Sequence, residues 1–169
     1  MKILKWVLPT VLVYGAYAYG AGSGADSYVG KPMPAFTMTS FDGKTISNAS
    51  LKGKPYILDF WATWCGPCKA ASPTMQAIHK KYASKGLVVI GASVDEPATV
   101  PAAKKYPKEH GYTYTFATNT TKIAQKLQME GVPCFMFVGK DGKVKAVKLG
   151  FGGPGSSPDD FEKLAKSLL

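Results

Sequence analysis

The chain has 169 residues, of which 46% are hydrophobic and 19% charged, which suits one packed domain and excludes a disordered chain. All 21 basic residues are lysines, and with 11 acidic residues they give a net charge of +10. The lysines are scattered and arginine is absent, which argues against a nucleic-acid partner, and three cysteines are too few for a small domain held by several disulfides.

The first 18 residues have the pattern of a secretion signal. Lys2 and Lys5 precede an apolar run that begins at Trp6, and Ala16-Tyr17-Ala18 has the small side chains of a cleavage site. We therefore expect residues 1–18 to be a signal peptide that is cleaved after Ala18.

The alternative for this segment is an uncleaved membrane anchor, because no charged residue occurs from Trp6 to Ala25. In either case the folded part would be secreted or periplasmic, or tethered outside the cytoplasm, where a dithiol can be oxidised. Residues 19–27 are rich in glycine and alanine and predict a flexible linker. Residues 28–169 are then expected to form one domain.

From residue 28 onward, patterns typical of strands alternate with patterns typical of helices. The predicted strands cover residues 35–41, 44–46, 56–61, 87–94, 112–117, 135–138 and 144–149. The predicted helices cover residues 66–84, 96–110, 120–128 and the C-terminal segment from residue 158. We expect the second helix to be broken near Pro101 and Pro107. This order predicts an α/β sandwich of three layers.

Cys65 and Cys68 lie where a buried strand turns into a helix. Cys65 would lie at the helix N-terminus, where free N–H groups and the positive end of the helix dipole stabilise a thiolate. Pro67 suits the first helical turn and stiffens the loop. We expect the Cys65 sulfur to face solvent and the Cys68 sulfur to be shielded.

Two other interpretations of this cysteine pair are possible. The pair could be half a zinc site completed by Cys134, His79 or His110, although the sequence has no second pair of this spacing. It could also be a structural disulfide, but closing a four-residue loop removes little chain entropy. The spacing and the position favour a redox-active disulfide that needs no other cofactor and no metal.

The string from Asp59 to Lys69, Asp-Phe-Trp-Ala-Thr-Trp-Cys-Gly-Pro-Cys-Lys, followed by Pro73, resembles the active site of the thioredoxin superfamily. The secretion signal and the predicted hairpin between Ala35 and Gly53 make the chain similar to the extracytoplasmic TlpA/ResA-like branch of thiol-disulfide oxidoreductases. The resemblance covers residues 28–169. It implies a three-layer thioredoxin-like α/β fold with a central mixed β-sheet, an N-terminal β-hairpin extension and a C-terminal helix.

The resemblance also implies catalytic roles for three residues. Cys65 would attack a substrate disulfide, and Cys68 would then attack Cys65 and release the reduced product. Asp59 corresponds to a buried acid behind the second cysteine and would accept the proton of Cys68. The alternative for Asp59 is a structural ion pair with Lys54 or Lys69.

Substrate contacts are implied for two loops. In the family, a cis-proline faces the cysteine pair, and Pro133 matches it, so the backbone beside Val132 would pair with an extended segment of the substrate. An ordinary trans proline at the start of a strand is the alternative. Trp64, at the rim, and Gly66 and Pro67, between the cysteines, would complete the substrate-binding surface.

Cys134 stands where the family commonly has threonine. We expect a buried, inert thiol, with a third redox sulfur or a soft-metal ligand as alternatives. A Cu(I)-binding module that uses Cys65, Cys68 and Cys134 is therefore a second hypothesis for the function. His79 and His110 have no recognisable catalytic setting and are assigned to the surface.

The function that the resemblance implies is the reduction of protein disulfides, followed by re-reduction of the enzyme by a membrane thiol-electron donor. The partners would be proteins with a dithiol or disulfide, apocytochrome c among them, which implies a role in cytochrome c maturation. The Gly66-Pro67 pair favours a reductase over a dithiol oxidase or isomerase. A peroxidase is disfavoured because no arginine is present. We expect a monomer.

Overall fold

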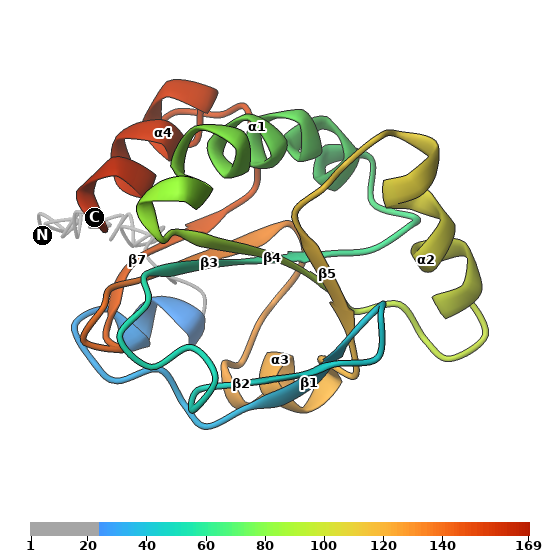
Figure 1. Ribbon diagram of the computed structural model, residues 1–169, viewed down its shortest axis with the longest axis horizontal. Coiled ribbons are helices and arrows are strands. Elements are labelled where there is room, and N and C mark those ends of the chain that lie inside the picture. Colours follow the sequence, from blue (N-terminus) through green and yellow to red (C-terminus); the bar gives the residue numbers. More distant parts are fainter. Residues whose placement is uncertain (1–23) are drawn as a thin grey trace, which may run out of the picture.

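A seven-stranded mixed sheet forms the centre of the protein, in the order β2-β1-β5-β4-β3-β6-β7 (Figure 1). The computed structural model describes residues 24–169, and the predicted signal or anchor lies outside them. The strands are β1 (Thr37–Ser40), β2 (Thr45–Ser47), β3 (Tyr56–Trp61), β4 (Val88–Ser93), β5 (Thr115–Thr118), β6 (Cys134–Val138) and β7 (Val144–Leu149). β3, β4 and β5 run parallel, and the other neighbouring strands are antiparallel.

Helices cover both faces of this sheet. They are η1 (Gly24–Tyr28), α1 (Gly66–Tyr82), η2 (Ala83–Lys85), α2 (Val100–Glu109), α3 (Thr121–Lys126) and α4 (Pro158–Ser167), of which η1 and η2 are 3-10 helices. Figure 1 shows α1 and α4 on one side of β3 and β4, and α3 on the other. The three-layer fold with an N-terminal hairpin, β1–β2, and a C-terminal helix, α4, is confirmed. No helix within residues 24–169 is both long and apolar enough to cross a membrane.

The central strand β3 places the residues that precede the cysteine pair. All six of its residues are buried, because it lies between β4 and β6 and both of its faces are covered. Ile57 and Trp61 pack in the apolar cluster that includes residues of α1, α2 and α4, whereas Leu58 and Phe60 pack in the cluster on the opposite face. By the alternation of a strand, Asp59 faces the α1 side together with Ile57 and Trp61.

Two predictions about local structure are wrong. Helix α2 is not broken at its prolines: it begins at Val100, and Pro101 lies in the first turn, where no N–H is needed. Pro107 lies inside the same continuous helix. The predicted linker of residues 19–27 is also not entirely a linker, because η1 begins at Gly24 and buries Ala25 completely.

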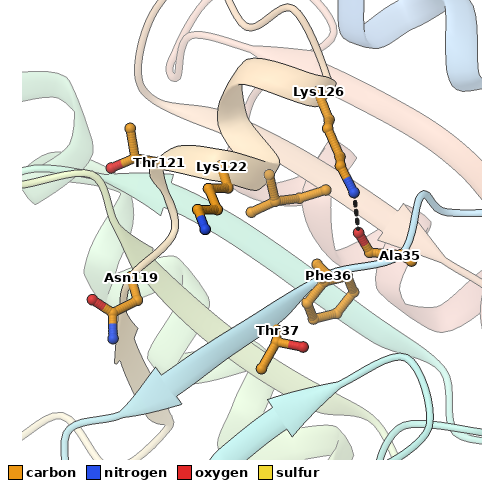
Figure 2. Close-up of a pocket in the computed structure, with 8 residues that line it drawn as sticks. Ala35, Phe36, Thr37, Asn119, Thr121, Lys122 and Lys126 are labelled. Carbon is orange, nitrogen blue, oxygen red and sulfur yellow. Dashed lines mark hydrogen bonds between the residues drawn. The ribbon is translucent and has the colours of Figure 1, made fainter.

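On the face opposite to α1, a cavity of about 680 Å³ opens between the beginning of β1 and α3 (Figure 2). Phe36 and Ile123 contribute apolar side chains to it, and Lys122 and Lys126 contribute two cations. This cavity is separate from the cysteine pair in sequence and in lining, and nothing in the sequence pattern indicated it.

Candidate active site

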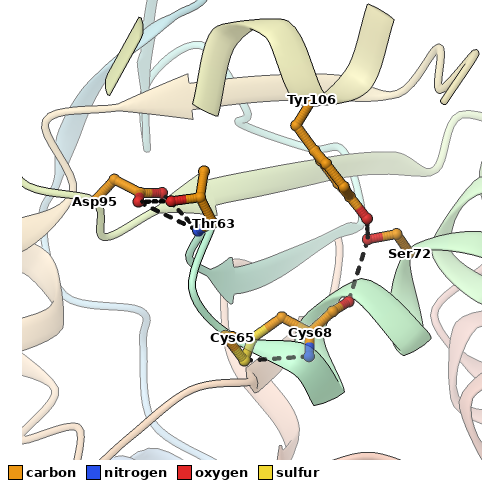
Figure 3. The surroundings of a disulfide bond; sticks show 6 residues. All are labelled: Thr63, Cys65, Cys68, Ser72, Asp95 and Tyr106. Atoms are coloured by element: carbon orange, nitrogen blue, oxygen red, sulfur yellow. Dashed lines mark hydrogen bonds between the residues drawn. A yellow bond between two sulfur atoms is a disulfide. The ribbon is translucent and has the colours of Figure 1, made fainter. Parts of the chain in front are cut away.

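Cys65 and Cys68 are joined by a disulfide at the N-terminus of α1, with their Cα atoms 5.3 Å apart (Figure 3). Cys65 is the residue that caps this helix, and its Sγ accepts a hydrogen bond from the backbone N–H of Cys68 at 3.2 Å. Pro67 lies in the first turn. Since a helix N-terminus has free N–H groups and the positive end of the dipole, this geometry stabilises negative charge on the Cys65 sulfur once the disulfide is reduced.

The two cysteines are less different in exposure than the sequence predicted. Cys65 is 4% exposed and Cys68 is 0% exposed, so the order is as expected, but the Cys65 side chain does not lie openly in solvent. The reason is packing, because both cysteines belong to the apolar cluster of β3 and α1. The exposed neighbour is Trp64, 70% exposed, at the predicted rim.

Asp59 is 1% exposed, and its Oδ1 atom has no hydrogen-bond partner in the described part of the chain. None of the ion pairs among residues 24–169 includes Asp59, so the alternative of a structural pair with Lys54 or Lys69 is wrong. Burial raises the pKa of Asp59 from 3.8 to about 8. This carboxyl group can therefore bind and release a proton close to neutral pH.

A chain of hydrogen bonds connects α2 to the cysteine pair (Figure 3). The hydroxyl of Tyr106 donates to the Oγ of Ser72 at 3.2 Å, and Ser72 donates to the backbone carbonyl of Cys68, also at 3.2 Å. Burial raises the pKa of Tyr106 to about 12, and the charge of Asp59 adds a smaller contribution in the same direction. Neither Ser72 nor Tyr106 was predicted from the sequence.

Asp95 holds the loop that leads into the cysteine pair. Its carboxylate accepts hydrogen bonds from the backbone N–H of Thr63 at 3.0 Å, from the Thr63 hydroxyl, and from the Ser93 hydroxyl at 2.8 Å. Thr63 precedes Cys65 by two residues, so this contact fixes the backbone between β3 and α1. Asp95 was not predicted from the sequence, although an acid two residues after a buried strand parallel to β3 was the available signal.

A second loop meets the disulfide loop at a cavity of about 460 Å³. The Val132–Pro133 peptide bond is cis, and the Pro133 carbonyl accepts a hydrogen bond from the N–H of Gly150 at 2.9 Å. Pro67, Val132 and Pro133 line this cavity together, although about 65 residues separate them in sequence. The remaining lining residues are Glu130, Gly131, Leu149, Gly150 and Phe151. Gly66 is exposed beside it.

Cys134 lies apart from the disulfide. It pairs with Phe60 in the sheet and belongs to the apolar cluster on the face opposite to Cys65 and Cys68. Burial raises the pKa of the Cys134 thiol to about 12, which keeps it protonated at neutral pH. The hypothesis of a Cu(I) site made from all three cysteines is therefore wrong in its geometry.

The histidines do not approach the cysteines as metal ligands would. His110 is exposed as predicted, but His79 is half-buried, and its Nδ1 has no partner among the described residues. Its placement on α1 above Tyr114 explains why it is not a simple surface residue. In residues 24–169, no three histidine, cysteine or acidic side chains are grouped as a metal site requires.

The known proteins that this chain resembles include thiol-disulfide oxidoreductases, in agreement with the disulfide at the start of α1. The model of the AhpC/TSA family matches residues 29–147. The chain is 37% identical over 149 residues to a thiol-disulfide oxidoreductase ResA of Bacillus cereus, covering 85% of each protein. It is 30% identical over 122 residues to ResA of Bacillus subtilis, covering 72% of this chain and 67% of that one. A thioredoxin-family thiol:disulfide interchange protein from Chlorobium tepidum TLS superposes with a TM-score of 0.70 at 34% identity, covering 81% of this chain and 94% of that one.

Proposed function

This chain belongs to the AhpC/TSA family and is a thiol-disulfide oxidoreductase of the ResA and DsbE type, and on that basis we propose that it reduces protein disulfides through Cys65 and Cys68. The observation that carries the proposal is the position of the disulfide, at the N-terminus of α1 and beside the cavity shared by Pro67, Val132 and Pro133. A nucleophilic sulfur and a docking surface for polypeptide are thereby brought together.

The reaction begins with the reduced protein. The Cys65 thiolate attacks one sulfur of the substrate disulfide, a mixed disulfide forms, and the other substrate sulfur leaves as a thiolate. Cys68 then loses its proton and attacks the Cys65 sulfur, so that the Cys65–Cys68 disulfide forms and the second substrate sulfur leaves. The substrate gains two electrons, its two thiolates take up protons, and the protein ends in the disulfide form.

Asp59 is the proton acceptor for Cys68 in this scheme. Its pKa of about 8 is close to the ordinary value of a cysteine thiol, about 8.5, so proton transfer between the two groups is nearly balanced. The unpartnered Oδ1 atom and the position on the α1 face of the sheet support this role. Resolution by Cys68 is fast because the attack is intramolecular.

The substrate segment binds in an extended conformation beside Val132. Among the described residues, no hydrogen bond uses the backbone N–H or C=O of Val132, so both groups are available to pair with a substrate strand. Half-exposed Leu149 offers an apolar surface at the same cavity, and exposed Trp64 extends the surface past the cysteines. Exposed Gly66 and Pro67 follow Cys65 directly, so the substrate-binding surface continues up to the largely buried Cys65 sulfur.

We also propose where the protein acts and which proteins it exchanges electrons with, on the basis of its similarity to ResA and DsbE. The N-terminal pattern supports a secreted or periplasmic protein, or one tethered to the outer side of the membrane. A membrane thiol-electron donor would reduce the Cys65–Cys68 disulfide again, and no further cofactor is required. Apocytochrome c is a candidate client, which would give a role in cytochrome c maturation, and the protein would act as a monomer.

The proposal also includes the direction of electron transfer, from the protein to the substrate disulfide. The Gly66-Pro67 pair between the cysteines supports a reducing protein rather than an oxidase or isomerase. Equilibration with fixed ratios of reduced to oxidised glutathione measures the reduction potential of the Cys65–Cys68 disulfide, which we expect to be about −270 mV. A midpoint near about −120 mV would make the protein an oxidant and overturn the reductase assignment.

Insulin reduction with dithiothreitol as the electron source tests the exchange itself. Cys65→Ser should abolish the catalysed reduction, and Cys68→Ser should accumulate a mixed disulfide with the substrate, visible by mass spectrometry. The matched control is Cys134→Ser, which removes a thiol on the other face of the sheet and should leave the rate unchanged. Full activity of Cys65→Ser would refute the proposal.

A further inference from the structure

The cavity between β1 and α3 has an apolar floor and a cationic wall. Phe36, which Figure 2 shows, and Ile123 line the cavity with buried apolar side chains. Lys122 and Lys126 lie one helical turn apart on α3, and both are exposed. We call this feature the Lys122–Lys126 groove, lined also by Ala35, Thr37, Asn119 and Thr121.

The two lysines carry charge that the described part of the chain does not neutralise. None of the ion pairs within residues 24–169 includes Lys122 or Lys126. Lys126 Nζ donates one hydrogen bond to the carbonyl of Ala35 at 3.0 Å, which places the ammonium group at the groove and leaves two of its N–H donors for a ligand. The groove therefore favours a ligand with carboxylates.

The groove also has an open strand edge. β1 pairs with β5 only at Thr39 and Ser40, after which the β5 chain turns away at Asn119, whose φ is 61°. The backbone N–H of Ser40 donates to the Lys44 carbonyl on the β2 side, so by alternation Thr37 directs its N–H and C=O to the β5 side. No residue of the described chain pairs with Thr37 on that side.

The groove lies at the same end of the sheet as the disulfide. β3 and β5 run in the same direction, each parallel to β4, and the cysteine pair follows the end of β3 just as α3 follows the end of β5. β1 is three strands away from β3, which corresponds to roughly 14 Å across the sheet. The two sites therefore share one end of the sheet, with the disulfide on the α1 face and the groove on the opposite face.

We propose that the Lys122–Lys126 groove binds an extended acidic segment of a protein partner. The segment would pair its backbone with Thr37, place an apolar side chain on Phe36 and Ile123, and direct carboxylates to Lys122 and Lys126. This is a second docking surface, distinct from the cavity beside Val132, and its binding requires no sulfur chemistry.

The probe is a capped peptide of about eight residues that alternates glutamate and valine, titrated into the isotopically labelled oxidised protein. We expect the largest amide shift changes at Thr37 and along α3. The variant Lys122→Glu/Lys126→Glu should weaken binding by at least about tenfold. The matched control is Lys104→Glu/Lys108→Glu, which makes the same charge change at the same spacing on α2 and should change affinity less than about twofold.

Equal weakening by both double variants would show only general attraction to a cationic protein and would overturn the proposal. Shift changes confined to residues outside the groove, or no binding at all, would also overturn it. Reduction of a small aromatic disulfide by the same variants should stay at the wild-type rate, because the cysteine pair is untouched. Failure of the wild-type protein to reduce this disulfide while it still binds the peptide would count against the proposed reductase and not against the groove.

Discussion

Two buried aspartates, one within β3 and one just beyond the neighbouring parallel strand β4, have opposite surroundings. Asp59 lies within β3, and Asp95 lies two residues after the end of β4. Asp95 is held by donors from Thr63 and Ser93, whereas the Oδ1 of Asp59 has no partner among the described residues and burial raises its pKa to about 8. Because its carboxylate is hydrogen-bonded, Asp95 fixes a loop, whereas Asp59, whose Oδ1 lacks a donor, can exchange a proton.

This difference matches the roles that the proposed reaction requires. The backbone before Cys65 must be held in place while its sulfur attacks, and Asp95 does this through the N–H of Thr63. Proton transfer from Cys68 requires a carboxylate whose pKa lies close to that of the thiol, and Asp59 in its ionised form meets that condition. Removing each carboxylate in turn should therefore have different consequences.

The largest effect is expected for Asp59→Asn and concerns the pH dependence of stability. In the folded wild type Asp59 stays protonated up to about pH 8, whereas in the unfolded chain it ionises near 3.8, so the folded state binds more protons between these values. This group therefore lowers the free energy of unfolding as pH rises, by roughly 6 kcal/mol over the whole window. Urea unfolding of both oxidised proteins across that range should show the wild type losing stability relative to the variant.

The matched control for this slope is Asp159→Asn, which removes an exposed carboxylate in the first turn of α4. Its stability should follow the wild-type pH dependence. Parallel curves for the wild type and Asp59→Asn would contradict the assignment of an elevated pKa to Asp59.

A smaller effect is expected for Asp95→Asn. The amide has only one acceptor oxygen in place of two, so it cannot satisfy the N–H of Thr63 together with the Thr63 and Ser93 hydroxyls. We expect a loss of about 2–3 kcal/mol in the free energy of unfolding at pH 7, measured with urea. Thr63→Ala, which keeps the backbone donor, should lose about 1 kcal/mol. Asp95→Asn as stable as the wild type would show that the contact does not hold the loop.

Much of the fold was predictable because its signals are local. The six-residue apolar run of β3 and the start of α1 at Cys65-Gly66-Pro67 can be read from neighbouring residues, and so can the hairpins β1–β2 and β6–β7. The α2 prolines were misinterpreted because a helix tolerates proline in its first turn, and because packing of α2 on the sheet overrides local preference at Pro107.

The candidate site also combines features that a local sequence pattern predicts with features that depend on contacts between distant residues. The roles proposed for Cys65, Cys68 and Asp59 follow from the family resemblance of one contiguous string. The two cysteines lie on the α1 side of the sheet, and the alternation along β3 places Asp59 on that side as well. The contact between Asp95 and Thr63 could not be found, because it joins residues 32 positions apart through the register of β3 and β4. The near-complete burial of Cys65 also depends on packing that no local pattern encodes.

The smallest effect is expected for Tyr106→Phe. The variant removes only the hydroxyl that donates to Ser72 and keeps the ring that packs on Trp61. We expect a loss of about 1 kcal/mol in the free energy of unfolding and less than a twofold change in the rate of insulin reduction. A much larger fall in rate at unchanged stability would mean that this hydroxyl takes part in the chemistry and that Asp59 does not act alone.

The central claim is that α1 presents a reactive thiolate at Cys65 while Cys134 remains inert. The most direct measurement is the rate of iodoacetamide alkylation of each cysteine in the reduced, folded protein at pH 7, followed by mass spectrometry. We predict that Cys65 reacts faster than free cysteine, whose pKa is about 8.5, and that buried Cys134 stays unmodified. A Cys65 no more reactive than free cysteine would contradict the account.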